Sequence, residues 1–233
     1  MLAQEGRILS SIERAAAALV RDCDLEPEWA SEICKLDPPT ELYPAGHELG
    51  PSGHRPHVKW ILDGWACEAR HLADGRRQIF SFVVPGEVAR PPEGVAARTV
   101  QTLTAVECID LTELAAQSVL GETVLQAITR SAALAHARRY EQLARLACRS
   151  ALCRTASLLV ELHGRLEAAG LTKDGEFALP LRHEELADAL GLSTAHVTRC
   201  LATLRARGLL TMQFRRVSGF DRAGLEALLR ENP

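Results

Sequence analysis

The sequence lacks any apolar run near the ~20 residues that a membrane-spanning helix requires. Its first twenty residues carry acidic and basic side chains where a secretory signal peptide needs an apolar block. It also lacks P-loop, GxSxG and HExxH patterns, and its His, Cys and Glu residues form no clear catalytic grouping. These absences predict a cytoplasmic protein that has no membrane partner and is not an enzyme.

Cysteine occurs seven times, but without a recognisable ligand spacing. No CxxC pattern occurs and the count is odd, so a disulfide framework, a four-thiolate metal site and an iron–sulfur cluster are not expected. We predict buried, reduced thiols, no metal and no cofactor. Four histidines leave a haem or metal site open as an alternative: His47, His54, His57 and His71.

The formal net charge of −3 is distributed unevenly along the chain. Residues 1–125 carry a net charge of −8, whereas residues 126–233 carry +5. Residues 193–216 contain five arginines and no acidic residue. The first half is therefore expected to repel a polyanion, and this segment of the second half to attract one.

Hydrophobic periodicity divides the chain into parts. Short helices are predicted within residues 1–35. Residues 40–115 contain short apolar runs separated by Gly, Pro and His, with a strong hairpin signal at Asp74-Gly75. This spacing is typical of a small β-barrel or jelly roll. Residues 112–150 return to a helical period.

The predicted helix over residues 112–150 has a broad apolar stripe. The stripe consists of Leu125, Ile128, Ala132, Ala135, Leu143 and Leu146. A long helix has to bury such a stripe, and a twin helix from a second copy can cover it. We therefore predict a homodimer formed through this helix. A core helix of a monomer is the alternative.

Residues 183–208 are predicted to form two helices with a tight break at Gly191, where positive φ favours glycine. Ser193 is a good N-cap for the second helix. Apolar residues recur on the inner side of both helices, at Leu186, Ala187, Leu190, Val197, Leu201 and Leu204. This is the helix-turn-helix pattern, whose second helix stands clear of the body and enters a DNA major groove. Two short strands over residues 209–220 then predict a wing, and Asp221 can cap a last helix.

The predicted DNA-contacting residues lie on the outer side of the second helix and on the wing. They are Ser193, Thr194, Ala195, His196, Thr198, Arg199, Arg205, Arg215 and Arg216. Arg199 can donate two hydrogen bonds to guanine O6 and N7. The later arginines are expected to meet phosphates, although a solvated hairpin tip is the alternative for Arg215 and Arg216.

The order of these parts resembles the CRP/FNR family of transcription regulators over roughly residues 40–230. The stretch ELADALGLSTAHVTRCLATLRARGLL is strongly similar to the family's helix-turn-helix, and YPAGHELG…ILDGWACEARHLADGRRQIFSFVVPGEV looks like its sensor domain. The resemblance implies an α+β fold: an N-terminal small β-barrel or jelly-roll sensor domain with N-terminal helices (1–111), a long dimerisation helix (112–150) and a C-terminal winged helix-turn-helix (151–233).

The resemblance also implies a homodimer that binds a palindromic operator in double-stranded DNA and works with RNA polymerase. It makes Arg199 a base-contacting arginine. Thr194 and Ala195 stand where other members have Arg and Glu, so the operator preference is expected to differ. Arg182 stands where many relatives have a Thr that caps the first helix, so weaker capping is expected there.

Family members that bind cyclic nucleotides use a Gly-Glu segment followed by an Arg-Ser or Arg-Thr pair. Gly86-Glu87 is present here, but the pair falls on Ala96-Ala97. Arg98-Thr99 offers the right residue types two positions later, which preserves the face of a strand and leaves a shifted site open.

The short, proline-containing loop before this pair leaves little room for a helix that could cradle phosphate. We therefore predict a regulator that is not controlled by a cyclic nucleotide, with the small-molecule effector unknown. The alternative function is a ligand-sensing or protein-interaction module whose winged helix contacts protein rather than DNA.

Overall fold

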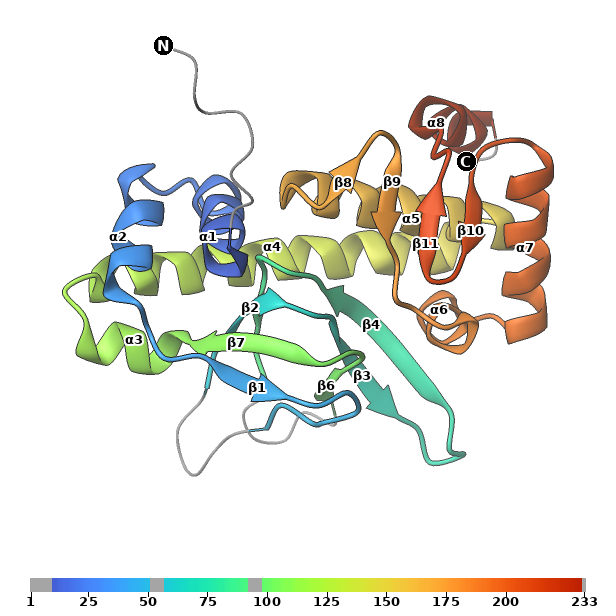
Figure 1. Ribbon diagram of the computed structural model, residues 1–233. Coiled ribbons are helices and arrows are strands. Elements are labelled where there is room, and N and C mark those ends of the chain that lie inside the picture. Colours follow the sequence, from blue (N-terminus) through green and yellow to red (C-terminus); the bar gives the residue numbers. More distant parts are fainter. Residues whose placement is uncertain (1–9, 51–56, 92–97, 232–233) are drawn as a thin grey trace, which may run out of the picture.

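The computed structural model describes residues 10–50, 57–91 and 98–231. The long helix α4 (Gly121–Cys148) runs through the molecule and touches both its N-terminal and its C-terminal part (Figure 1). The sheets of the N-terminal part lie below α4, and α1 and α2 lie above it (Figure 1). In the described ranges, no helix has the length and apolarity needed to cross a bilayer.

Two short helices open the described chain, as the sequence predicted: α1 (Ser11–Asp22) and α2 (Glu28–Leu36). Ser10 caps α1, because its hydroxyl accepts a hydrogen bond from the backbone N–H of Glu13 while the Glu13 carboxylate accepts one from the N–H of Ser10. Trp29 of α2 packs against Trp60 of the sheet, with ring centroids 5.9 Å apart. These helices therefore cover one face of the N-terminal sheet.

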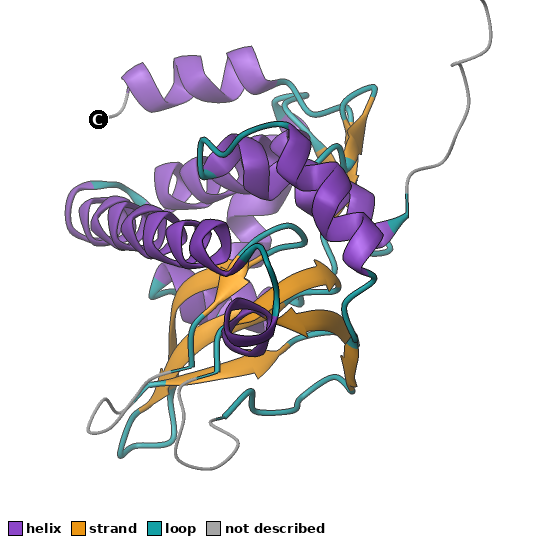
Figure 2. Ribbon diagram, turned by 90° about the vertical axis from the view of Figure 1, so that its left-hand side faces the viewer, coloured by secondary structure: helices purple, strands orange, loops and turns teal. Residues whose placement is uncertain are grey.

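The N-terminal part contains two antiparallel sheets. Their strands are β1 (Glu41–Tyr43), β2 (Lys59–Asp63), β3 (Ala66–His71), β4 (Arg77–Val83), β5 (Val88–Ala89), β6 (Thr99–Thr102) and β7 (Val106–Asp110). One sheet has the order β1-β7-β2-β5 and the other the order β4-β3-β6. Figure 2 shows these strands in the lower half of the molecule, with most of the helices above them. The predicted hairpin at Asp74-Gly75 joins β3 and β4, and Gly75 has the expected positive φ of 83°. Among the described strands the two sheets stay open, so the domain is a roll rather than a closed barrel.

The space between the two sheets is filled by apolar side chains from both. This cluster consists of Leu49, Ile61, Ala66, Val83, Ala89, Val100, Val106 and Cys108. All seven cysteines of the chain are free, and five of them are buried. The prediction of buried thiols is wrong for Cys148, which is exposed, and for Cys34, which is partly exposed.

The segment predicted as one helix over residues 112–150 is broken. A short helix, α3 (Leu111–Gln117), ends at Ser118, which has extended backbone angles, and α4 begins only at Gly121. The inward face of α4 carries Val124, Ala127, Gln142 and Arg145. The outward face carries Leu125, Tyr140 and Leu143, all exposed. Leu125 and Leu143 of the predicted stripe are thus exposed, whereas its members Ile128, Ala135 and Leu146 are half-buried within the chain. The stripe therefore mixes residues of both faces.

The C-terminal part is a winged helix. Its elements are α5 (Ala151–Ala168), β8 (Thr172–Lys173), β9 (Glu176–Ala178), α6 (His183–Leu190), α7 (Thr194–Ala206), β10 (Thr211–Gln213), β11 (Arg216–Ser218) and α8 (Arg222–Glu231). The strands form one antiparallel sheet in the order β10-β11-β9-β8. The core of this part is continuous with Trp65, Phe82 and Val84 of the N-terminal part. The two parts are therefore packed together through apolar contacts.

Candidate nucleic-acid interface and sensor pocket

The two helices of the predicted helix-turn-helix are α6 and α7. Gly191 ends α6 with a φ of 62°, a left-handed conformation that side chains other than glycine rarely adopt. Ser193 caps α7 by accepting a hydrogen bond from the backbone N–H of His196. The predicted inward residues are all buried, at Leu186, Ala187, Leu190, Val197, Leu201 and Leu204. The turn geometry expected from the sequence is therefore present.

The N-terminus of α6 is anchored without a capping hydroxyl. The carboxylate of Glu185 accepts hydrogen bonds from the backbone N–H of Arg182 at 2.6 Å and from its guanidinium at 2.9 Å. Glu185 is buried, whereas the Arg182 side chain is more than half exposed. Arg182 therefore secures the start of α6 through Glu185, a partner that the sequence comparison with capping threonines did not reveal.

The outer face of α7 exposes part of the predicted contact set. Ala195, Thr198, Arg199 and Arg205 are exposed, whereas Thr194 and His196 are half-buried. The Thr198 hydroxyl lies 3.0 Å from Nδ1 of His183 and donates to the carbonyl of Thr194. Among the described residues, no carboxylate lies within ion-pair distance of the Arg199 or Arg205 guanidinium. Both charges are available to a partner.

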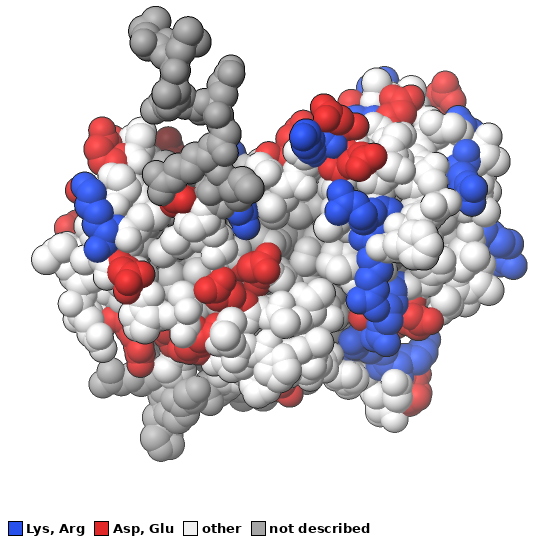
Figure 3. All heavy atoms as spheres, in the orientation of Figure 1, with Lys and Arg blue, Asp and Glu red and all other residues white. Residues whose placement is uncertain are grey.

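The wing is the hairpin of β10 and β11, and it carries the other predicted contacts. Arg215 and Arg216 are exposed at its tip, and Arg216 lies 3.8 Å from Glu176. A hollow of about 440 Å³ between α7 and the wing is lined by Arg205 and Met212, among others. Figure 3 shows Lys and Arg gathered over the C-terminal part of this face, and Asp and Glu more often over the N-terminal part. The charge asymmetry of the sequence is thus an asymmetry of the surface.

Gly86 lies where cyclic-nucleotide-binding relatives have the glycine of their phosphate site, and here it has a packing role. Its φ is 92°, and a Cβ at this position would lie 2.7 Å from Cβ of Ala18 in α1. Its carbonyl accepts a hydrogen bond from Nε1 of Trp60 at 3.2 Å. Glycine is therefore required here by the close approach of α1, irrespective of any ligand.

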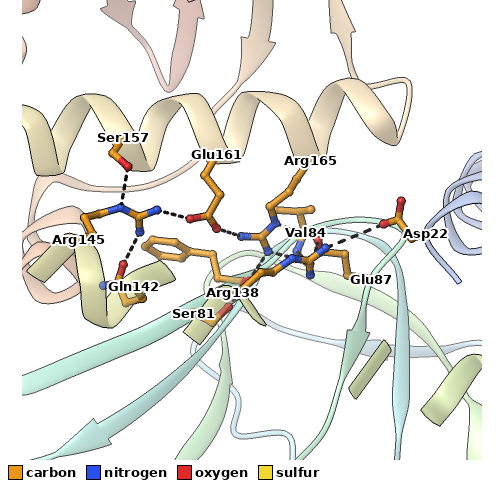
Figure 4. A network of polar contacts seen from close by, with 11 residues as sticks. Asp22, Ser81, Val84, Glu87, Arg138, Gln142, Arg145, Ser157, Glu161 and Arg165 are labelled. Atoms are coloured by element: carbon orange, nitrogen blue, oxygen red, sulfur yellow. Dashed lines mark hydrogen bonds and ion pairs between the residues drawn. The ribbon is translucent and has the colours of Figure 1, made fainter. Parts of the chain in front are cut away.

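Glu87 is held by the chain's own arginines (Figure 4). Its carboxylate accepts hydrogen bonds from Arg165 of α5 at 2.6 and 2.9 Å, pairs with Arg138 of α4 at 2.8 Å, and accepts the Val84 N–H at 3.1 Å. Burial alone would raise the pKa of Glu87, but the charges of Arg165 and Arg138 outweigh it and the pKa lies below its ordinary value. The hollow beside Glu87 holds about 20 Å³, room for about one water molecule.

The structure does not bring Arg98 and Glu87 together at one site, because each pairs with a different partner. The guanidinium of Arg98 lies 3.2 Å from Glu68, which also accepts hydrogen bonds from Arg139 of α4 at 2.8 to 3.1 Å. Thr99 starts β6 and pairs with Ala69 of β3. The Ala96-Ala97 pair lies outside the described residues. The candidate carboxylate Glu87 is thus neutralised from α4 and α5, and the partner of Arg98, Glu68, is neutralised from α4 as well.

Glu87 is one end of a polar chain that sequence reasoning missed (Figure 4). Arg165 also donates to Glu161 at 2.8 Å, Glu161 pairs with Arg145, and Arg145 bonds to Gln142. The Gln142 amide donates to the carbonyl of Ala189 in α6 at 2.5 Å. A chain of charged and amide groups therefore runs from the N-terminal roll of strands β1 to β7 to α6, the first helix of the helix-turn-helix.

Of the four candidate haem or metal histidines, His54 lies outside the described residues. His57 pairs with Asp110, His47 packs against Tyr43, and His71 ends β3. Within the described ranges, no three His, Cys, Asp or Glu side chains are grouped as a metal site would require.

The family model of the Crp-like helix-turn-helix domain matches residues 153–228 of the chain. A transcriptional regulatory protein, btr, of Bordetella pertussis is 27% identical over 162 residues, which are 67% of this chain and 66% of that protein. The nitrogen fixation regulation protein FixK of Rhizobium meliloti is 32% identical over 148 residues, 62% of this chain and 64% of that protein. The matched stretch thus covers slightly less than two thirds of each relative.

Solved structures show the same fold over most of the chain. FixK2 from Bradyrhizobium japonicum superposes with a TM-score of 0.68 at 24% identity and covers 82% of this chain and 96% of its own. A CooA mutant from Carboxydothermus hydrogenoformans has a TM-score of 0.64 at 16% identity and covers 91% and 95%. Residues 153–228 thus match a Crp-like helix-turn-helix domain, and the chain is similar in sequence to two regulatory proteins and in fold to FixK2 and CooA.

Proposed function

We propose that the protein is a sequence-specific regulator of transcription that binds a palindromic operator in double-stranded DNA as a homodimer. The exposed face of α7 carries the proposal, because it presents Arg199 and Arg205 and no acidic residue. A helix held clear of the body by a buried inner face can enter a major groove about 12 Å wide.

In this arrangement the first turns of α7 meet base edges and the wing meets the backbone. Arg199 contacts a guanine, and Ala195 and Thr198 lie beside it on the exposed face. The other members of the interface contact phosphates or support the helix: Ser193, Thr194, His196, Arg205, Arg215 and Arg216. Thr194 and His196 are half-exposed, so they offer DNA less surface than the fully exposed residues do.

The homodimer would form through the outward face of α4. Leu125, Tyr140 and Leu143 are between 57% and 69% exposed, which is unusual for large apolar side chains on one helix face. Alanines at positions 133, 137, 144 and 147 are exposed on the same side and allow close approach of a second helix. Two copies joined in this way would read half-sites about 34 Å apart.

Cyclic nucleotide is not expected to control the protein. Glu87 already has two arginine partners, and the hollow of about 20 Å³ beside it would have to open widely for a nucleotide. The effector, if the protein has one, is unassigned, and no cofactor is proposed. RNA polymerase in the cytoplasm is proposed as the further partner because family members act on transcription.

Selection from random-sequence duplexes followed by fluorescence anisotropy tests this function. The selected operator is expected to bind about 10³-fold or more tightly than random DNA, with affinity falling steeply as salt rises. Arg199→Ala is expected to lose about 1–3 kcal/mol and relax specificity at one base pair of each half-site. Arg222→Ala, which also removes one exposed positive charge but lies on α8, is the matched control.

Equal affinity of the unmodified protein for selected and random duplexes would contradict the proposal. Weak binding with little salt dependence would favour the alternative, in which the winged helix contacts protein. Sedimentation of the free protein separately tests the dimer.

A further inference from the structure

The tip of the wing is built from residues that a tight hairpin turn does not favour. Gln213 pairs with Arg216, so Phe214 and Arg215 form a two-residue loop. Both have positive φ, 48° for Phe214 and 60° for Arg215, the signature of a type I′ turn. Such turns are usually Asn-Gly, because left-handed backbone costs roughly 1–2 kcal/mol for other residues.

Phe214 is also exposed almost completely, at 96% of its surface. An aromatic ring in water forgoes roughly 1.5–3 kcal/mol that burial would contribute. The sequence therefore accepts two unfavourable features at one position, backbone strain and apolar exposure. Strain that the surrounding structure maintains is characteristic of functional positions.

The turn is held firmly by its neighbours. The carbonyl of Arg215 accepts a hydrogen bond from the N–H of Leu179 at 2.8 Å. Val217, next to the turn in β11, is fully buried, and β11 pairs with β9 on its other side. The ring therefore projects from a fixed sheet, and little ordering is needed when it meets a partner.

Charge identifies the chemistry of that partner. Arg215 and Arg216 follow Phe214 directly, and no acidic residue occurs between Ser193 and Arg216. Residues 207–210 join α7 to the three-residue strand β10, and this strand contacts α7. An exposed apolar ring next to two guanidinium groups, on a hairpin beside a helix in the major groove, fits a DNA base step reached from the minor groove.

We propose that Phe214 is a wedge that enters the minor groove next to each half-site and partly unstacks a base step. Arg215 and Arg216 hold the neighbouring phosphates or the groove floor beside the ring. Easily unstacked steps, TA or CA/TG, are then preferred at that position although no hydrogen bond reads them. This inference rests on the proposed function and adds a second element of specificity to it.

Phe214→Asn separates binding from folding, because asparagine suits the left-handed turn. The variant is expected to unfold at the same or a higher denaturant concentration than the unmodified protein. Its affinity for the selected operator is expected to fall about tenfold. An operator with 2-aminopurine at the flanking step is expected to brighten on binding the unmodified protein but not this variant.

Two further variants complete the test. Phe214→Leu keeps an apolar wedge and is expected to retain part of the 2-aminopurine signal. Arg199→Ala is expected to lose affinity yet still give that signal at saturating protein, since it acts in the other groove. This pattern distinguishes the wedge from base reading by α7.

Unchanged affinity and unchanged 2-aminopurine fluorescence in Phe214→Asn would overturn the wedge, while the loss in Arg199→Ala would leave the proposed function standing. If Phe214→Asn instead changes only the sedimentation of the free protein or its binding to purified RNA polymerase, the tip meets protein and the inference is wrong. Failure of the unmodified protein to select any operator would overturn the proposed function itself.

Discussion

Replacing Glu87 with glutamine is expected to destabilise the protein strongly. Glu87 and the Arg165 side chain are each only 8% exposed, so the pair is shielded from water. Glutamine keeps the size of the side chain but removes its negative charge. Arg165 and Arg138 then face a neutral amide where each had a carboxylate.

The loss of unfolding free energy depends on which ion pairs remain for the two arginines. Breaking a buried ion pair by removing one member costs about 3–5 kcal/mol. Arg165 would keep Glu161 at 2.8 Å, and among the carboxylates of the described residues Arg138 would keep only Asp22, at 4.0 Å. Because one arginine is still paired, we expect the lower end of that range, about 3 kcal/mol, a large part of the 5–15 kcal/mol typical of domains.

Urea unfolding followed by circular dichroism measures this loss. Glu226→Gln is the control, since Glu226 pairs with Arg222 on the surface of α8 at an i,i+4 spacing worth about 0.3–0.5 kcal/mol. Hydrogen exchange is expected to rise first where α5 meets the turn before β5. If Glu87→Gln costs no more than the control, the buried pair does not stabilise the contact between the two parts.

Three other outcomes are expected. Ser193→Ala removes the cap of α7 and should lower the unfolding free energy by about 1 kcal/mol in urea titrations, with glycine at this position less harmful. Burial would raise the pKa of Asp110, but hydrogen bonds from Lys59 and His57 lower it overall. Its stabilising contribution is therefore present above pH ~4 and lost as pH falls further, so Asp110→Asn should flatten the acid end of the stability profile. Leu143→Glu should shift the sedimentation of the free protein toward a monomer and weaken operator binding while leaving the unfolding curve of the monomer unchanged.

The helix-turn-helix could be predicted from the sequence because its determinants are local. Gly191, Ser193 and the apolar residues of α6 and α7 lie within one short stretch, and each acts on its immediate neighbours. The hairpin at Asp74-Gly75 was predictable for the same reason. In contrast, Glu87 and Arg165 are separated by 78 positions. No periodicity connects them, so the sequence left a ligand role for Glu87 open where the fold contains an ion pair.

The wing was predicted, but the left-handed turn at its tip was not, for a different reason. Phe-Arg is not a dipeptide that favours positive φ, and only the pairing of Gln213 with Arg216 forces both residues into it. The break between α3 and α4 was similarly hidden, because helical spacing continues on both sides of Ser118. At the break, the Ser118 hydroxyl accepts a hydrogen bond from the N–H of Leu120 at 3.2 Å, a local contact that the helical spacing does not reveal.

The two faces of α4 connect the proposed dimer with the DNA-binding part. On the inner face, Arg138 holds Glu87 and Arg139 holds Glu68, and Gln142 bonds to the carbonyl of Ala189 in α6. In the proposed homodimer, the outer face packs against a second copy. A shift of α4 on dimer formation would therefore be transmitted to the sensor roll and to the helix-turn-helix at once. Since close-packed interiors do not deform continuously, dimerisation itself can set the position of α7 without a ligand in the roll.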